Sequence, residues 1–151
     1  MEKINKKMIM WGVMLFMLCL TCGCDKKWPI NGNLDGYWQL MTVETKSDGV
    51  KTNCHRMYIG IQLHMIELKD LGNNGYKNFF GELNYDEDKN IVVIKNLKEK
   101  VSTSDNGQMA DIKDLNHYGI NSQETVFDVI KADGKTLILE SDYARLTMRS
   151  F

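Results

Sequence analysis

The length, composition and charge of this chain exclude some classes of protein at once. It has 151 residues, 43% of them hydrophobic, and its 19 basic residues nearly balance 20 acidic ones. A chain of this length fits one domain, and the absence of a basic patch or arginine-rich stripe argues against a nucleic-acid partner.

The first 24 residues predict a targeting segment. Lysines at positions 3, 6 and 7 precede an uncharged run from Met8 to Thr21. A basic start followed by about a dozen apolar residues is typical of a secretory signal, and the run is shorter than the ~20 residues that a spanning helix needs. The alternatives are a plain secreted protein and a short anchor that stays uncleaved.

The end of this segment resembles a bacterial lipobox. In "LCLTCGCDKK", Cys24 follows Gly23, and the resemblance implies that Cys24 is acylated and begins the mature protein. Thr21 stands where most lipoboxes have leucine, and Cys22 is a second candidate. Each buried methylene of an acyl chain such as palmitate contributes about 0.8 kcal/mol, so two or three chains would hold the protein on a bilayer.

Removal of the signal changes the cysteine and charge balance. Cys54 is then the one remaining free thiol, so the fold must be stable without an internal disulfide. Cys54 and His55 are neighbours on a predicted strand and point to opposite faces, so we expect an inert, half-buried thiol. Without the three lysines and one glutamate of the signal, 16 basic and 19 acidic residues give a net charge of −3.

A short tether and the first strands follow. Residues 25–33, "DKKWPINGN", are typical of a tether, and residues 34–151 are expected to form one domain. "YWQLMTVETK" predicts a strand that ends at an Asp48-Gly49 turn. The next run, "CHRMYIGIQLHMIELKD", alternates and then slips in phase, which predicts a bulge or bend near Met65. Its apolar face before the slip consists of Met57, Ile59, Ile61, Leu63 and Met65.

The remaining elements predict an antiparallel barrel or sandwich with one helix. Strands are expected at 76–85, 91–97, 124–132, 136–141 and 143–151, separated by turns rich in Gly, Asn and Asp. Between the second and third of these ranges the apolar residues recur at helical spacing and end before Gly119, a candidate C-cap. One short helix is therefore expected before the final hairpin, over Met109, Ile112 and Leu115.

Gly36-Tyr37-Trp38 resembles the Gly-x-Trp signature of the lipocalin and calycin superfamily. Together with "LNHYGI" and a C-terminal "ARLTMRSF", it makes residues 31–151 similar to small lipocalin-like lipoproteins of gut Gram-negative anaerobes. The resemblance implies an all-β, antiparallel up-and-down barrel. In it, Trp38 closes one end and Arg145 or Arg149 packs across the indole, a contact worth ~1 to 2 kcal/mol. The chain departs from typical lipocalins in its shorter length, its lack of their disulfide and the place of its helix.

The sequence carries no recognisable reaction chemistry. His55, His64 and His117 are scattered, and residues 86–90 alternate like a calcium loop but lack its glycine and distal glutamate. No nucleophile elbow or phosphate-binding glycine loop is present. We therefore expect no enzyme, no catalytic residue, no metal site and no cofactor.

Two functions remain open at this stage. The first is the binding of a small lipophilic ligand inside the barrel, which the resemblance implies, lined by Met57, Ile59, Ile61, Leu63 and Phe80. The second is an envelope protein-interaction module or inhibitor with a solid core. In both cases we expect a monomer held on the membrane by its lipid, on the periplasmic side of the outer membrane. Asp25 after the cysteine would favour inner-membrane retention under the sorting rule of some bacteria.

Overall fold

Alternating apolar residues form the strands that make up most of this chain. The computed structural model describes residues 29–102 and 104–151. Its strands are β1 (Gly36–Thr45), β2 (Lys51–Gln62), β3 (Met65–Asp70), β4 (Phe79–Asp86), β5 (Ile91–Val101), β6 (Ser104–Met109), β7 (Glu124–Ala132), β8 (Thr136–Glu140) and β9 (Ala144–Ser150). A 3-10 turn, η1 (Gly32–Leu34), precedes β1, and α2 (Ile112–Leu115) continues into η2 (Asn116–Tyr118) before β7.

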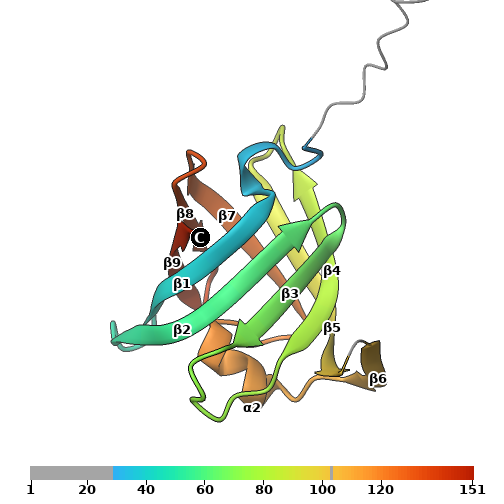
Figure 1. Cartoon of the computed structure of the whole chain (residues 1–151). Helices are drawn as coiled ribbons and strands as arrows, with labels where there is room; N and C mark the ends of the chain where they lie inside the picture. The colour runs from blue at the N-terminus through green and yellow to red at the C-terminus, as the bar shows by residue number, and fades with distance from the viewer. Residues whose placement is uncertain (1–28, 103) are drawn as a thin grey trace, which may run out of the picture.

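Eight of these strands close into an antiparallel barrel (Figure 1). The first and last strands are neighbours: Trp38 of β1 lies opposite Ser150 of β9. The barrel continues from β1 through β2, β3 and β4 to β5, then through β7 and β8 to β9, while β6 pairs with β5 as an appended edge. The predicted all-β barrel, with the two ends of the domain side by side, is confirmed.

The phase slip in this run marks a hairpin. Of the two predicted alternatives, the bulge near Met65 is wrong and the bend is confirmed as a full reversal of the chain. The chain reverses at Leu63 and His64, with Leu63 at φ 57°, so that Gln62 lies opposite Met65 and Ile61 opposite Ile66. Residues that lie opposite each other share a face of the sheet, which explains why the inward positions pass from odd to even numbers.

The helix before β7 is short, as predicted. Asp111 caps α2 by accepting a hydrogen bond from the backbone N–H of Lys113, and Gly119 ends η2 in the left-handed conformation, at φ 75° and ψ 25°. The sequence prediction of Gly119 as a C-cap is confirmed. In the part of the chain that the structure describes, no helix has the length and apolar character to span a bilayer.

The segment before β1 is folded against the barrel, and the predicted tether is therefore too long. Asn31 and Leu34 are each 2% exposed. The side-chain amide of Asn31 donates to the carbonyl of Leu63 at 2.6 Å, and that of Asn33 donates to the carbonyl of Ala132 at 3.0 Å. Residues 29–33 thus belong to the domain, and residues 25–28 lie outside the described part of the chain.

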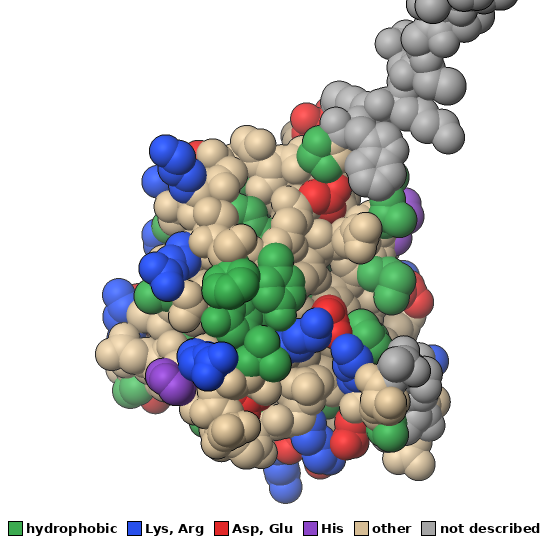
Figure 2. Space-filling model, in the orientation of Figure 1, with side chains coloured by type: hydrophobic (Ala, Val, Ile, Leu, Met, Phe, Trp, Pro, Cys, Tyr) green, Lys and Arg blue, Asp and Glu red, His purple; other side chains and the backbone are tan. Residues whose placement is uncertain are grey.

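Hydrophobic side chains gather on the outer face over β1 and β2, with lysines beside them (Figure 2). Tyr37 and Tyr58 stack with ring centroids 5.3 Å apart and an interplanar angle of 8°. Phe151 meets both rings edge-on, at 5.8 Å and 5.0 Å, and is itself 76% exposed. The outer face of the barrel therefore carries an aromatic cluster, in which Tyr58 is 5% exposed and Phe151 covers it only in part.

Candidate binding groove

The interior of the barrel is filled by the protein's own side chains. Each barrel strand contributes to one core cluster, in which the residues named here are between 0% and 2% exposed: Leu40, Ile59, Leu68, Leu83, Val92, Phe127, Leu137 and Leu146. Side chains that lined a void large enough for water would be partly accessible, whereas these side chains are almost fully buried. An eight-stranded barrel encloses just enough space for such a core or for one small ligand. In this barrel the core side chains occupy that space.

The five residues predicted to line an interior pocket therefore do not share one. Met57, Ile59 and Ile61 point inward, are each 2% exposed and belong to the core, which is the solid-core alternative that the sequence left open. Leu63 lies in the β2–β3 turn and Phe80 on the outer face of β4. These two residues border a groove on the outside of the barrel, which Ile61 also reaches.

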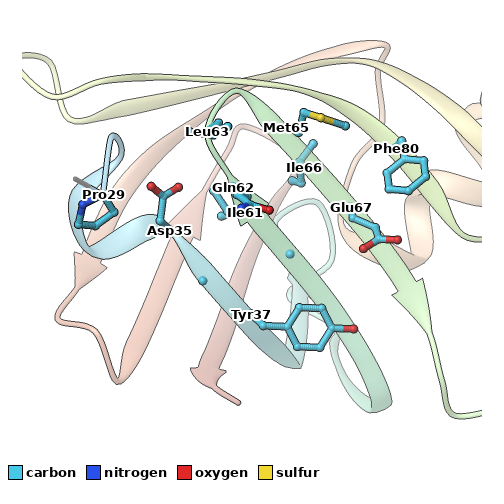
Figure 3. Close-up of a pocket in the computed structure, with 12 residues that line it drawn as sticks. Pro29, Asp35, Tyr37, Ile61, Gln62, Leu63, Met65, Ile66, Glu67 and Phe80 are labelled. Carbon is cyan, nitrogen blue, oxygen red and sulfur yellow. The ribbon is translucent and has the colours of Figure 1, made fainter. Parts of the chain in front are cut away.

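This groove crosses the outer face of β1 to β4 and has a volume of about 640 Å³. Pro29 and Asp35 lie at one end and Phe80 at the other, with Met65 on one side and Tyr37 on the opposite side (Figure 3). Small-molecule sites commonly occupy roughly 300 to 1,000 Å³. The groove is therefore large enough for a small ligand, although it is open along its length.

Gly60 forms the floor of the groove. The strand register places Gly60 opposite both Tyr37 and Glu67, and Glu67 opposite Phe80, so these positions form one row across four strands. A Cβ at Gly60 would lie 3.3 Å from Cδ2 of Tyr37 and 3.8 Å from Cβ of Glu67. The missing side chain keeps the row open. A glycine inside a strand is the sequence signal that could have located this site.

Two lysines hold the carboxylate of Glu67 in this row. Lys69 Nζ lies 2.7 Å and Lys100 Nζ 2.5 Å from its oxygens. Burial alone would raise the pKa of Glu67, but hydrogen bonds from Lys100 and Lys69 outweigh burial and lower this pKa. The same ammonium groups lie over the walls, Lys100 at 4.6 Å from the ring centre of Phe80 and Lys69 at 5.5 Å from that of Tyr37. Salt bridges and cation–π contacts thus fix both aromatic walls.

Trp38 lies inside the barrel, as its resemblance to the Gly-x-Trp signature implies. It is 2% exposed, and its Nε1–H donates to the carbonyl of Leu34 at 2.8 Å. Gly36 has φ 146°, a conformation that L side chains rarely adopt. The indole therefore joins the η1 segment to the core and has a structural role.

The predicted arginine cover over Trp38 is wrong. Side chains alternate along β9, where Leu146 and Met148 point inward, so Arg145 and Arg149 point outward. Arg149 donates to Oε1 of Gln39 at 2.9 Å and 2.7 Å.

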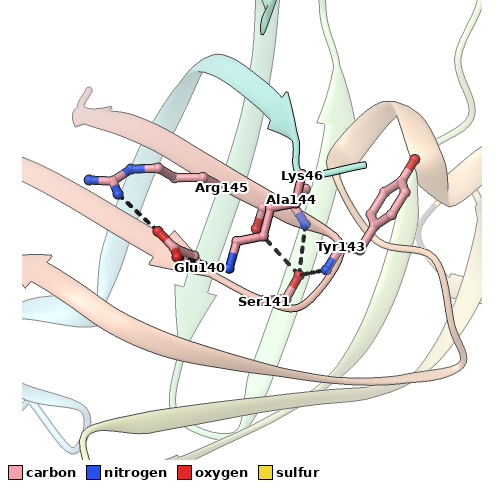
Figure 4. A network of polar contacts seen from close by, with 6 residues as sticks. All are labelled: Lys46, Glu140, Ser141, Tyr143, Ala144 and Arg145. Carbon is pink, nitrogen blue, oxygen red and sulfur yellow. Dashed lines mark hydrogen bonds and ion pairs between the residues drawn. The ribbon is translucent and has the colours of Figure 1, made fainter. Parts of the chain in front are cut away.

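Arg145 lies in a separate polar network on the outside. Its Nη1 is 2.9 Å from Glu140, which also binds Lys46 at 2.8 Å (Figure 4). In the adjoining turn, Oγ of Ser141 accepts hydrogen bonds from the backbone N–H groups of Tyr143 and Ala144. These contacts order the β8–β9 turn and leave no guanidinium near the indole.

A smaller cavity, of about 160 Å³, lies near the helix and includes Cys54 and His117 in its lining. The His117 ring stacks on Tyr76 with centroids 3.8 Å apart. Among residues 29–102 and 104–151, no group of three or more His, Cys, Asp or Glu side chains could hold a metal ion. We find no arrangement for metal or nucleophilic chemistry in this part of the chain.

We expect Cys54 to be nearly unreactive in the folded protein. Burial raises the pKa of its thiol from 9.0 to about 11, and because the thiolate is the reactive form, alkylation at pH 8 should be roughly 100-fold slower than in urea. The folded state favours the neutral thiol, so this group's contribution to stability decreases as the pH rises from 9 toward 11. Mass spectrometry of the Cys54 peptide after timed iodoacetamide treatment measures the rate, and equal rates in both states would contradict this expectation.

The fold and the groove define a class of protein: a small closed β-barrel with a solid core and an open groove on its outer face. Residues 16–151 match the model of the lipocalin-like domain family. The chain therefore belongs to that family, whose barrels are generally non-enzymatic.

Two solved structures are similar to this chain in fold. A lipocalin-like protein from Bacteroides uniformis is 23% identical with a TM-score of 0.58, covering 80% of this chain and 100% of its own. An uncharacterized protein from Bacteroides eggerthii is 18% identical, also with a TM-score of 0.58, covering 78% of this chain and 98% of its own. No curated protein matches. These likenesses support the barrel and carry no ligand over to this chain.

Proposed function

We propose that this chain is a non-catalytic, lipid-anchored binding protein of the cell envelope, which holds a small lipophilic molecule in the groove on its outer face. One observation carries the proposal: a groove of about 640 Å³ crosses β1 to β4, while the core side chains occupy the barrel interior. Lipocalin-like barrels are suited to binding, and the groove offers space for a small ligand on the outside of this barrel.

The chemistry of the groove favours a lipophilic ligand. Apolar contact area comes from Tyr37, Phe80, Leu63 and Met65, and Gly60 allows a ligand to approach the backbone. The lysines that border it already bind Glu67. A mostly apolar concave surface with a few fixed polar groups is the usual character of a small-molecule site.

Filling the floor of the groove should abolish this binding. In Gly60→Leu, the new side chain would occupy the space between Tyr37 and Glu67, and we expect the affinity for the fluorescent probe N-phenyl-1-naphthylamine to fall roughly tenfold or more. Val126→Leu places the same leucine side chain at an outward position of β7, away from the groove, that is 49% exposed, and it should leave the affinity unchanged. Fluorescence titration compares the two variants with the unchanged protein.

Unchanged probe affinity in Gly60→Leu would mean that the probe does not bind in the groove. The aromatic cluster, where Phe151 is 76% exposed, favours the second candidate, a protein-interaction module. Crosslinking in whole envelopes tests that candidate: loss of a specific adduct in Phe151→Ser, with retention in Gly60→Leu, would support a protein partner and oppose the lipophilic ligand.

The anchor is supported by the resemblance of the first 24 residues to a lipoprotein signal. We expect mass spectrometry of membrane-extracted protein to find an acylated N-terminal Cys24, and Cys24→Ala to release the chain from washed outer membranes. Cys22→Ala is the matched control and should remain membrane-bound. Retention of Cys24→Ala together with release of Cys22→Ala would move the lipid to Cys22, and an intact unacylated N-terminus would overturn the anchor.

A further inference from the structure

Three exposed hydrophobic side chains belong to the β2–β3 turn and to the segment bound to it, beside the groove. Ile30, Leu63 and Met65 are 45%, 37% and 55% exposed. The amide of Asn31 donates to the carbonyl of Leu63, which holds the segment that carries Ile30 against the β2–β3 turn. Pro29, Leu63 and Met65 all line the groove. We call Ile30, Leu63 and Met65 the apolar rim.

The apolar rim lies close to the proposed anchor along the chain. Ile30 follows Cys24 by six residues, and six residues extend to about 20 Å at most. The 12 residues of β2 span about 40 Å, so the tether is short relative to the barrel. The end of the barrel with the apolar rim is therefore held nearer to the acylated cysteine than the end with the β1–β2 turn.

The residues between the anchor and the apolar rim have the composition of a membrane interface. Lys26 and Lys27 are followed by Trp28. Lysines next to a bilayer are attracted by anionic headgroups, and tryptophan is enriched at the level of the headgroups. Charged and interfacial residue types thus directly precede the segment that carries Ile30 in the sequence.

We propose that the apolar rim docks into the headgroup region of the bilayer that carries the anchor. This inference rests on the lipid anchor of the proposed function, and its occupant is bilayer lipid. Insertion removes the side chains of Ile30, Leu63 and Met65 from water. It also turns one end of the groove toward the membrane, so that a lipophilic molecule passes between bilayer and groove without crossing water.

The experiment uses the full, acylated protein in vesicles of phosphatidylethanolamine and phosphatidylglycerol. In a Cys54→Ser background, Met65→Cys or Leu63→Cys receives an environment-sensitive NBD label, and Ser47→Cys, at an exposed position of the β1–β2 turn, is the control. A lipid with a doxyl group near the headgroup quenches labels that enter the interface. We expect quenching at positions 63 and 65 roughly threefold or more above that at 47, with blue-shifted emission.

The outcomes separate this inference from the proposed function. Equal quenching at positions 47 and 65, with an acyl chain confirmed on Cys24 by mass spectrometry, overturns the docking and leaves the anchor in place. Absence of the acyl chain overturns the anchor and the docking together. Normal docking with no probe affinity in the groove would retain the inference and overturn the lipophilic ligand. Two labelled positions on the apolar rim guard against one variant that fails to fold.

Discussion

Gly119→Ala should destabilise the protein by about 3 kcal/mol. Gly119 has φ 75°, a conformation that costs a residue with a Cβ about 1 to 2 kcal/mol. The new Cβ would also lie 2.3 Å from Cδ2 of Leu146 and 3.2 Å from Cγ1 of Val43. Leu146 is 1% exposed and can shift only against other core side chains, so overpacking adds roughly 1 to 3 kcal/mol. Urea unfolding measures the free energy, and the midpoint of thermal unfolding should fall by about 10 °C.

Gly134→Ala is the matched control for this variant. Gly134 has φ 79°, and a Cβ there would meet no atom within 4 Å. The backbone penalty is then the same while the steric contact is absent, so we expect a loss of about 1 kcal/mol. Equal losses at the two positions would show that the close packing of Gly119 against Leu146 and Val43 contributes nothing.

Much of the fold could be predicted because strand alternation and turn chemistry are local. The alternating run after Gly36 and the Asp48-Gly49 and Asp133-Gly134 turns predict an antiparallel sheet on their own, and Gly119 marks the end of the helix. β6 could not be found this way, since "SDNGQM" has neither apolar alternation nor branched residues. It is a strand because β5 extends beyond its barrel partners and offers a free edge.

The hairpin at Leu63 and His64 shows why a phase slip is ambiguous. "QLHM" has no glycine, asparagine or proline to signal a turn, and a bulge shifts the apolar phase by one residue just as a two-residue turn does. Only the pairing of β2 with β3 separates these readings.

The groove depends on contacts between strands, which the sequence does not contain. Tyr37, Gly60, Glu67 and Phe80 come from four different strands, and only their register puts them in one row. The cover predicted over Trp38 failed for a related reason. Arginines suited by type occur on β9, but their parity along the strand places them outside.

Trp38→Ala should be among the most destabilising single changes in the described barrel. Truncation of a buried tryptophan typically costs about 3 to 5 kcal/mol. The substitution also removes the Nε1–H group that donates a hydrogen bond to the carbonyl of Leu34. Leu34 and Trp38 are each 2% exposed, so this carbonyl loses a buried partner. We expect a loss of about 4 kcal/mol and detachment of η1 from the barrel, measured by urea unfolding and by faster amide hydrogen exchange in residues 31–36.

The arginine variants decide whether the indole has a cationic cover. Arg149 donates hydrogen bonds to the side-chain oxygen of Gln39 on the outside of the barrel. Arg145 and Lys46 both form salt bridges with Glu140. Exposed pairs of this kind contribute about 0 to 1 kcal/mol, so Arg145→Ala and Arg149→Ala should each change the free energy of unfolding by less than ~1 kcal/mol. Near-ultraviolet circular dichroism of Trp38 should stay unchanged in both variants. A partly desolvated cation–π contact is worth ~2 kcal/mol. A decrease in the free energy of unfolding above ~2 kcal/mol, together with an altered indole signal in either variant, would therefore mean that the guanidinium packs on Trp38.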